Sequence, residues 1–500
     1  MRKEWILDLV FNLIITITIS ILGFVVSKVF IDNMGITNLG LMKLFSQIVA
    51  YLTLLDMGLS SAAMYYFYKP LNEGDWNRIS EIFTTISSFY KKISILIVIL
   101  GLVLSPLVIY ISGENLKIAY IYWFIYVINS SLSYTLIKYS TLFLADQKYR
   151  TVKIIDGLGS CFEKIIQLYV IIYFKSFILF IIISTLFFCI KLYFYRRKFI
   201  ENYPEVKLTF KKDLEILKTA KKVLFHKISY MIVYNTDYMI ISKFISLAAV
   251  GIYSGYLTIY NLVMTIIGIF HSVLDSKLGK VISKNSNNRN LIFWEIMFRV
   301  SFLVGTVLVL IFYFSINDFI ILWLGKQYIF ELSTVFIISL NLFIDIVKWP
   351  VELFKYKYGY VKDIHLPILE SFINLCLSII LVRKIGINGV LLGTLSSNII
   401  IVLIFRGILV FENCFLKNKN IYLKELMINF FFTIMSCYIV NLFLKKYLRY
   451  EGLSWNSWII SLFTRSIFLM FVVFFIFLLR RKFRYSLYKL FQINKEEDIQ

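Results

Sequence analysis

The chain is 500 residues long, and its composition excludes a series of soluble domains. Hydrophobic residues make up 59% of it, aromatic residues 18% and charged residues only 17%, whereas about a quarter of a soluble domain is charged. The formal net charge of +23 does not indicate a nucleic-acid partner, because Lys and Arg gather in the cytoplasmic loops of membrane proteins. The composition therefore predicts an all-α polytopic membrane protein.

Fourteen apolar segments follow one another along the chain. Each crossing of a bilayer takes about 20 residues of helix, so fourteen crossings would use roughly three fifths of the residues. The expected spans are 9–31, 40–66, 80–110, 117–144, 154–174, 176–195, 223–246, 250–272, 292–316, 331–354, 364–383, 388–410, 425–444 and 458–479. An even number of spans places both termini on one side of the membrane.

Basic residues predict which side that is. Of the 53 Lys and Arg residues, 32 fall in connections on the side of the termini, and fewer than ten fall in those on the other side. Connections rich in Lys and Arg stay in the cytoplasm. Both termini are therefore expected to be cytoplasmic.

Loop lengths and a weak internal repeat suggest how the chain is divided. The longest cytoplasmic connection has the pattern of an interfacial amphipathic helix, with Phe210 and Leu214 on one face and lysines around it. Gly40 and Gly251 begin spans that lie six apart, which favours two parallel repeats, although glycine follows many tight turns for conformational reasons alone. The expected divisions are an N-lobe at 1–195, a linker at 196–222, a C-lobe at 223–411, two further spans in 412–479 and a cytoplasmic tail at 480–500.

Motifs of catalysis and metal binding are absent from the sequence. It contains no G-x-x-x-x-G-K-[ST], G-x-S-x-G or H-E-x-x-H. The five cysteines include no C-x-x-C pair and the three histidines are isolated, so neither a disulfide framework nor a metal cluster is predicted. The outer connections hold about a dozen residues at most, too few for a domain. The chain is expected not to be an enzyme and to hold no cofactor.

Ionisable residues within the spans are the candidates for function, because a charge in hydrocarbon is costly unless it is paired or hydrated. The most central are Asp56, Glu163, Lys164 and Asp237. Asp56 and Asp237 have no opposite charge three or four residues along their helices, which leads to the hypothesis that they bind H⁺ or Na⁺ and couple it to transport. Pairing across helices with a lysine is the structural alternative.

The remaining lysines allow two interpretations. Lys43 lies close enough to an interface for its ammonium group to reach water, which is the favoured interpretation. Lys348 and Glu352 are four residues apart around Pro350, so they either neutralise each other or face a water-filled path.

Two stretches are similar to those of a known family. The stretch GITNLGLMKLFSQIVAYLTLLDMGLSSAAMYYFYKPL contains an L-x-D-x-G-L-x-x-A pattern from Leu54 to Ala62, and YNTDYMIISKFISLAAVGIYSGYLTIYNL contains Asp237, Gly251 and Tyr253 at recurring positions. Both stretches resemble bacterial polysaccharide flippases of the multidrug, oligosaccharidyl-lipid and polysaccharide exporter superfamily.

The resemblance implies two six-helix lobes around a central cavity, with two extra C-terminal helices. It implies that the protein flips undecaprenyl-diphosphate-linked oligosaccharide repeat units across the bacterial cytoplasmic membrane by alternating access, for a capsule-like or O-antigen-like polysaccharide. The expected partners are that lipid-linked substrate, membrane lipids, and a polysaccharide polymerase with its chain-length machinery; nucleic acid is not among them. The residues expected to bind substrate are Lys28, Asp56, Lys138, Lys227, Tyr234, Asp237, Asn261 and Lys348.

Two other functions fit parts of the sequence. A cation-coupled multidrug exporter resembles the flippases, but such exporters usually have twelve spans. A membrane glycosyltransferase or repeat-unit polymerase would act on the same lipid, but would need a large outer loop with paired acids. The short outer connections favour the flippase over an enzyme.

Overall fold

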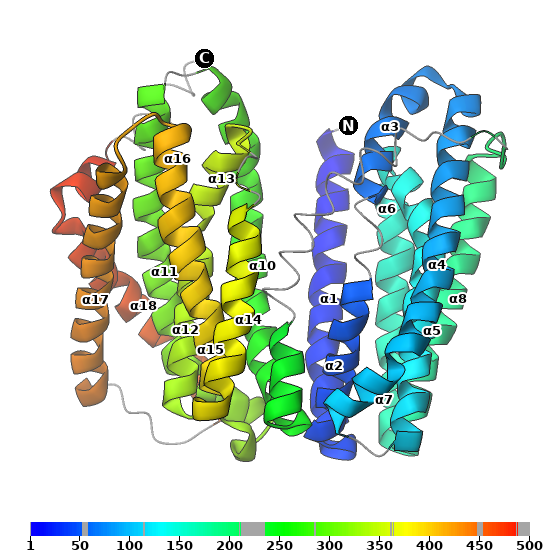
Figure 1. Cartoon of the computed structure of the whole chain (residues 1–500), viewed down its shortest axis with the longest axis horizontal. Coiled ribbons are helices and arrows are strands. Elements are labelled where there is room, and N and C mark those ends of the chain that lie inside the picture. Colours follow the sequence, from blue (N-terminus) through cyan, green and yellow to red (C-terminus); the bar gives the residue numbers. More distant parts are fainter. Residues whose placement is uncertain are drawn as a thin grey trace. The chain divides into compact units, whose positions relative to one another are not determined.

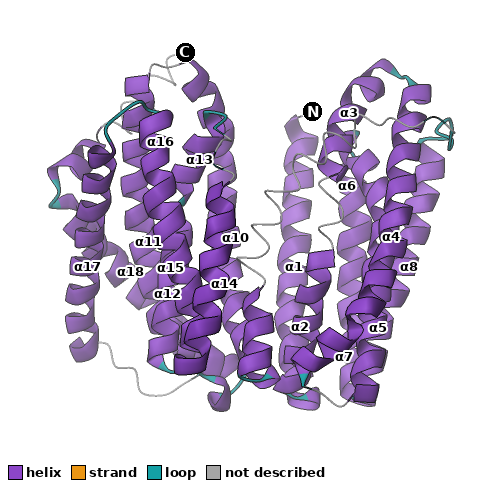
Figure 2. Cartoon of the chain, viewed as in Figure 1, coloured by secondary structure: helices purple, strands orange, loops and turns teal. Residues whose placement is uncertain are grey.

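The computed structural model describes residues 2–52, 59–113, 116–209, 211, 236–284, 287–360, 363, 365–447, 454–486 and 488. These residues form helices joined by short turns, and none of them lies in a strand (Figure 2). They divide into two compact units, Met1–Gly251 and Ile252–Gln500. The lobe boundaries expected from the sequence stay predictions, because residues 210 and 212–235, which include the end of the expected linker and the start of 223–246, lie outside the described residues.

The first unit is built from the helices before residue 203 (Figure 1). They are α1 (Arg2–Met34), α2 (Ile36–Leu52), α3 (Leu59–Glu73), α4 (Trp76–Ser112), α5 (Leu116–Ala145), α6 (Tyr149–Lys153), the π-helix η2 (Ile154–Leu158), α7 (Gly159–Phe174) and α8 (Phe177–Asn202). α4 packs on α5, α5 on α8, α8 on α7 and α7 on α1.

The second unit holds the remaining helices, and α10 begins just before it. They are α10 (Leu247–Lys284), α11 (Asn287–Trp323), the 3₁₀ turn η3 (Lys326–Tyr328), α12 (Leu332–Val347), α13 (Trp349–Lys357), α14 (His365–Ile385), α15 (Ile387–Ser397), the π-helix η4 (Asn398–Arg406), α16 (Gly407–Asn413), α17 (Lys419–Tyr447) and α18 (Trp455–Leu478). α11 contacts α12, α17 and α18, while α14 packs along α15.

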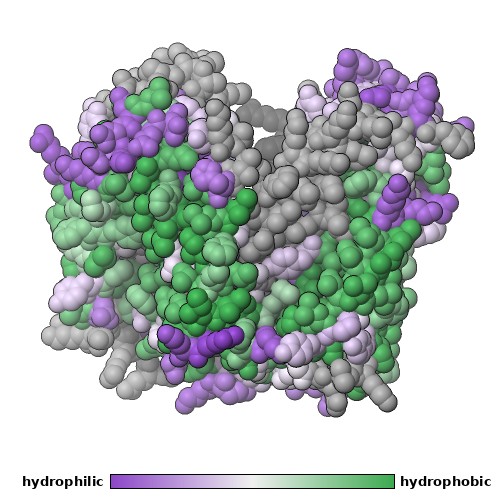
Figure 3. All heavy atoms as spheres, in the orientation of Figure 1, coloured by the Kyte–Doolittle hydropathy of each residue, from purple (hydrophilic) through white to green (hydrophobic). Residues whose placement is uncertain are grey.

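The expected spans agree with the helices observed. Within the described residues, eleven helices are long and apolar enough to cross a membrane, and each coincides with an expected span. Of the other three expected spans, 117–144 is helical as α5, 40–66 falls on α2 and α3 with 53–58 outside the described part, and 223–246 is described only from residue 236. The chain is thus a polytopic all-α membrane protein. On the face drawn in Figure 3, hydrophobic atoms cover the middle of each unit and hydrophilic atoms gather at its ends.

Local sequence signals set where these helices begin and end. Asp75 caps α4, its side chain accepting a hydrogen bond from Arg78 N at 2.9 Å. Gly113 ends the same helix with φ 69°, a left-handed conformation that glycine adopts without strain. At the start of α18, Ser454 and Ser457 bond reciprocally to each other's backbone as a capping box.

Small and polar side chains hold α4 against α5. The Ser94 and Ser131 hydroxyls lie 2.6 Å apart, and Trp123 Nε1 donates to Gly101 O at 2.8 Å. A Cβ added at Gly101 would lie 2.5 Å from Val127 Cγ1. Helices in lipid associate through such close packing and interhelical hydrogen bonds, so Gly101 allows this contact.

Gly101→Ala should therefore destabilise the protein by about 1–3 kcal/mol, because the stiff Val127 side chain has to move. The matched control is Gly268→Ala in α10, where nothing lies within 4 Å of the added Cβ. That change should be neutral or stabilise by about 0.4–1 kcal/mol. Thermal unfolding midpoints in one detergent test the pair, and equal midpoints for both variants would contradict the packing argument.

Candidate functional site

Two lysines lie close together inside the first unit. Lys43 on α2 and Lys164 on α7 are both half-buried and close enough to act on each other electrostatically. A Cβ added at Gly23 of α1 would lie 3.9 Å from Lys164 Nζ, so this ammonium group also lies against α1. Among the described residues, neither lysine has a carboxylate within ion-pair distance or a hydrogen-bond partner.

The acid nearest to Lys164 in sequence is engaged elsewhere. Glu163 accepts a hydrogen bond from Ser184 Oγ at 2.7 Å and lies 3.7 Å from Lys191 Nζ. Lys191 also donates to Ser160 Oγ at 3.0 Å. Glu163 and Lys191 thus neutralise each other between α7 and α8. Lys43 and Lys164 remain as two like charges within electrostatic range of each other, which is unfavourable without an anion or water nearby.

The structure places the two described lysines of this unit that were predicted to bind substrate, Lys28 and Lys138, in separate environments. Lys28 forms an ion pair with Asp32 at 2.9 Å on its own helix, and both side chains are more than a third exposed. Lys138 on α5 donates to Ser87 Oγ of α4 at 3.0 Å, and its Nζ lies 4.9 Å from the centroid of the Tyr139 ring. Neither lysine belongs to the Lys43–Lys164 pair.

Asp237 is the only one of the two proposed coupling acids that the described residues include. It lies in a helical stretch at 236–244 and is 5% exposed. It acts electrostatically on Tyr51 of α2 and on its neighbour Tyr238, so it has partners beyond its own helical turn. Asp56, Lys227 and Tyr234, also predicted to bind substrate or ions, lie outside the described residues.

Lys348 lies in a second polar cluster, inside the other unit. Its Nζ is 2.6 Å from Asp345 Oδ1 and 3.2 Å from Asn398 Oδ1 at the start of η4. Tyr260 of α10 donates to the other oxygen of Asp345. The predicted Lys348–Glu352 pairing is not what the structure shows: α12 ends at Val347, and the ammonium group turns back to Asp345.

Glu352 belongs instead to a cluster around Arg406. The Arg406 guanidinium lies 2.9 Å from Glu352 and 3.3 Å from Glu370. Its Nε is 3.6 Å from Asp363, which also pairs with Lys355 at 2.5 Å. Two cations and three carboxylates thus form one network of ion pairs that joins α13, α14, η4 and the connection between α13 and α14. Asn261, the last predicted site residue, is exposed on α10, and its carbonyl accepts from Thr265 Oγ1 at 2.7 Å.

Solved structures resemble this arrangement over most of its length. One is an inward-facing multidrug resistance MATE family transporter of the MOP superfamily, with a TM-score of 0.62, 14% identity, and coverage of 77% of this chain and 93% of that one. Another is the lipid II flippase MurJ in an inward closed conformation, with a TM-score of 0.65, 16% identity, and coverage of 94% and 100%. The chain has the fold of MOP-superfamily transporters. No protein-family model and no curated protein matches the sequence.

The sequence did not identify the Lys43–Lys164 pair. Lys164 stood out as a central charge, but Lys43 was interpreted as reaching the interface. The two lysines come from α2 and α7, and helical spacing says nothing about which residues meet across helices. The signal that the sequence offered was the number of basic residues inside the spans.

Replacing Lys348 by Met should cost about 3–5 kcal/mol, because it leaves the Asp345 carboxylate buried without its cation. Lys28→Met is the matched control, since its partner Asp32 is exposed to water and such pairs contribute about 0–1 kcal/mol. The free energies of unfolding of the two variants, measured in the same detergent, test this prediction. A Lys348→Met protein as stable as Lys28→Met would mean that the Asp345–Lys348 pair is not structural.

Proposed function

We propose that the protein is a flippase for an anionic lipid-linked oligosaccharide, with the lipid diphosphate bound by Lys43 and Lys164. The observation that carries this proposal is that Lys43 and Lys164 lie within electrostatic range of each other, and that neither has a carboxylate within ion-pair distance among the described residues. Phosphate oxygens form strong charge-assisted hydrogen bonds with such groups. A diphosphate would supply the negative charge that these two lysines lack, while the lipid tail stays in the bilayer.

The extent of the structural likeness supports a flippase over a drug exporter. The alignment with MurJ, whose name gives it as a lipid II flippase, leaves 6% of the chain uncovered, or about 30 residues. That is shorter than α17 and α18 together, which hold 29 and 24 residues. The MurJ likeness therefore extends into these last helices, whereas the MATE alignment covers only 77% of the chain.

A multidrug exporter is the second candidate, favoured by the likeness to a MATE family transporter. The Lys43–Lys164 pair argues against cationic drugs as its substrate, because like charges repel at a desolvated site. A glycosyltransferase or polymerase is less favoured, since the expected outer connections are too short to form a large loop with paired acids.

The remaining features of the proposal follow from the sequence. The substrate would be an undecaprenyl-diphosphate-linked repeat unit of a capsule-like polysaccharide, moved outward across a bacterial cytoplasmic membrane. Both termini would be cytoplasmic, as the 32 basic residues on their side favour. A polymerase with its chain-length machinery would receive the flipped lipid. Asp237 would couple H⁺ or Na⁺ by binding it more tightly in one state of the transport cycle.

Reconstituted vesicles test the function and its site together. The unaltered chain should move a polyprenyl-diphosphate-linked oligosaccharide between leaflets, measured by its accessibility to an added glycosidase. Lys43→Gln with Lys164→Gln should slow this transfer by at least about tenfold, because two charge-assisted hydrogen bonds are lost.

The matched control is Lys69→Gln with Lys198→Gln. Both lysines are exposed and paired with an acid on their own helix, Glu73 at 3.8 Å and Glu201 at 2.7 Å. This variant has the same net charge as the site variant and should keep full transfer. Normal transfer in the site variant would remove the lysine pair from the mechanism, and export of organic cations alone by the unaltered chain would favour the drug exporter.

A further inference from the structure

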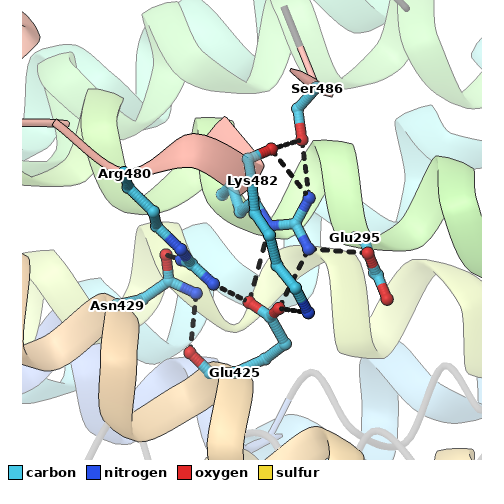
Figure 4. Close-up of polar contacts among 7 residues, drawn as sticks. Glu295, Glu425, Asn429, Arg480, Lys482 and Ser486 are labelled. Atoms are coloured by element: carbon cyan, nitrogen blue, oxygen red, sulfur yellow. Dashed lines mark hydrogen bonds and ion pairs between the residues drawn. The ribbon is translucent and has the colours of Figure 1, made fainter. Parts of the chain in front are cut away.

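A single buried carboxylate holds the segment that follows α18. Glu425, near the start of α17, is 3% exposed and accepts hydrogen bonds from Arg299 Nη2 at 2.9 Å and from Arg480 Nη2. Lys482 Nζ lies 3.3 Å from the same carboxylate. Figure 4 shows Arg480 and Lys482 converging on Glu425. Three cations from two parts of the chain thus share one acid.

Further contacts fix the direction of residues 480–486. Arg299 of α11 also donates to Ser486 Oγ at 2.6 Å, to Lys482 O at 3.3 Å and to Glu295 at 2.6 Å. Arg480 Nη1 donates to Asn429 Oδ1 at 2.7 Å. These bonds tie 480–486 to α11 and α17, and we call the segment the tail clamp. Its Phe483 is fully buried, so the clamp has an inner and an outer face.

The outer face of the tail clamp is strongly basic. Arg481 and Arg484 are exposed, and the Lys482 side chain is 63% exposed. The sequence contains no Asp or Glu from residue 452 to residue 495, so no acid near them in the chain balances these charges. Leu479 and Tyr485 are each 55% exposed beside them. Basic residues mixed with exposed apolar and aromatic ones are typical of a segment at the surface of a bilayer.

An apolar groove runs along α11 and α18 toward this basic face. Its volume is about 630 Å³, and it is lined by Leu303, Val304, Val307, Leu308, Ile311, Ile467, Met470, Phe471 and Phe474. The two helices are antiparallel, because Arg465 of α18 contacts Phe314 O of α11 at 2.7 Å while Arg299 contacts Ser486. Arg299 precedes the groove by one turn of α11, and Arg480 follows Phe474 by six residues. The groove therefore ends beside the tail clamp.

We propose that this groove and the outer face of the tail clamp together bind an anionic phospholipid, with an acyl chain in the groove and the headgroup phosphate on Arg481, Lys482 and Arg484. The groove has the apolar lining that an acyl chain requires, and the basic face complements an anionic headgroup. The hydrogen bonds and ion pairs around the buried Glu425 hold the basic face beside the end of the groove. This lipid is a membrane component and not the transported substrate, so the site is separate from Lys43 and Lys164.

Lipid retained by the purified full-length protein tests the proposal. The protein is incorporated into nanodiscs containing equal amounts of phosphatidylglycerol and phosphatidylcholine, extracted in mild detergent and weighed by native mass spectrometry. We expect the unaltered chain to retain phosphatidylglycerol selectively. Arg481→Gln with Arg484→Gln should reduce this retention by about tenfold, because each basic residue at an anionic surface contributes to binding. Val304→Trp, which fills the groove, should reduce it as well.

The matched control is Arg197→Gln with Lys198→Gln. It removes two exposed charges that both pair with Glu201, at 3.0 and 2.7 Å, and should retain as much phosphatidylglycerol as the unaltered chain. Equal retention of both phospholipids by the unaltered chain would overturn the proposal, as would full retention in the Arg481/Arg484 variant. Retention of an added polyprenyl diphosphate in place of phosphatidylglycerol would also overturn it. Lipid transfer by these variants does not enter the test, so its outcome is independent of the proposed flippase activity.

Discussion

Because the bilayer interior contains no water, only certain positions in this protein can hold a charged side chain. A charged side chain inside a helical membrane protein needs an opposite charge, a hydrogen-bonding partner or a water-filled space. The second unit meets this requirement with its own residues. Arg299 and Arg480 share Glu425, Arg406 lies among Glu352, Glu370 and Asp363, and Lys348 pairs with Asp345.

The first unit meets the same requirement at Glu163 and Lys191, but not, within its described residues, at Lys43 and Lys164. Where a protein leaves two cations together in this way, an anion is the physical complement. In the function proposed above, that anion is the transported lipid. A lipid diphosphate has the charge and the apolar tail that such a site in a membrane would select.

How much the sequence could predict depended on whether a property belongs to one helix or to several. Spans such as 80–110 and 292–316 follow from length and hydropathy alone, and α4 and α11 cover them. Side-chain partners do not follow, because helical periodicity gives the face of a residue but not its neighbour on another helix. The Lys348–Asp345 pair is local, and its reason is different: α12 ends at Val347, and the ammonium group turns back to Asp345 rather than on to Glu352. The sequence predicted a tail at 480–500, but the bonds that join Arg480 to Glu425 and Asn429 are contacts across more than 50 residues.

The most direct test of the central claim is a cryo-electron microscopy structure of the full chain in nanodiscs with a polyprenyl-diphosphate-linked sugar. The account predicts density for the diphosphate about 3 Å from the ammonium groups of both Lys43 and Lys164. A diphosphate bound elsewhere would contradict it. So would an acidic side chain from the rest of the chain lying between these two lysines in the lipid-bound structure.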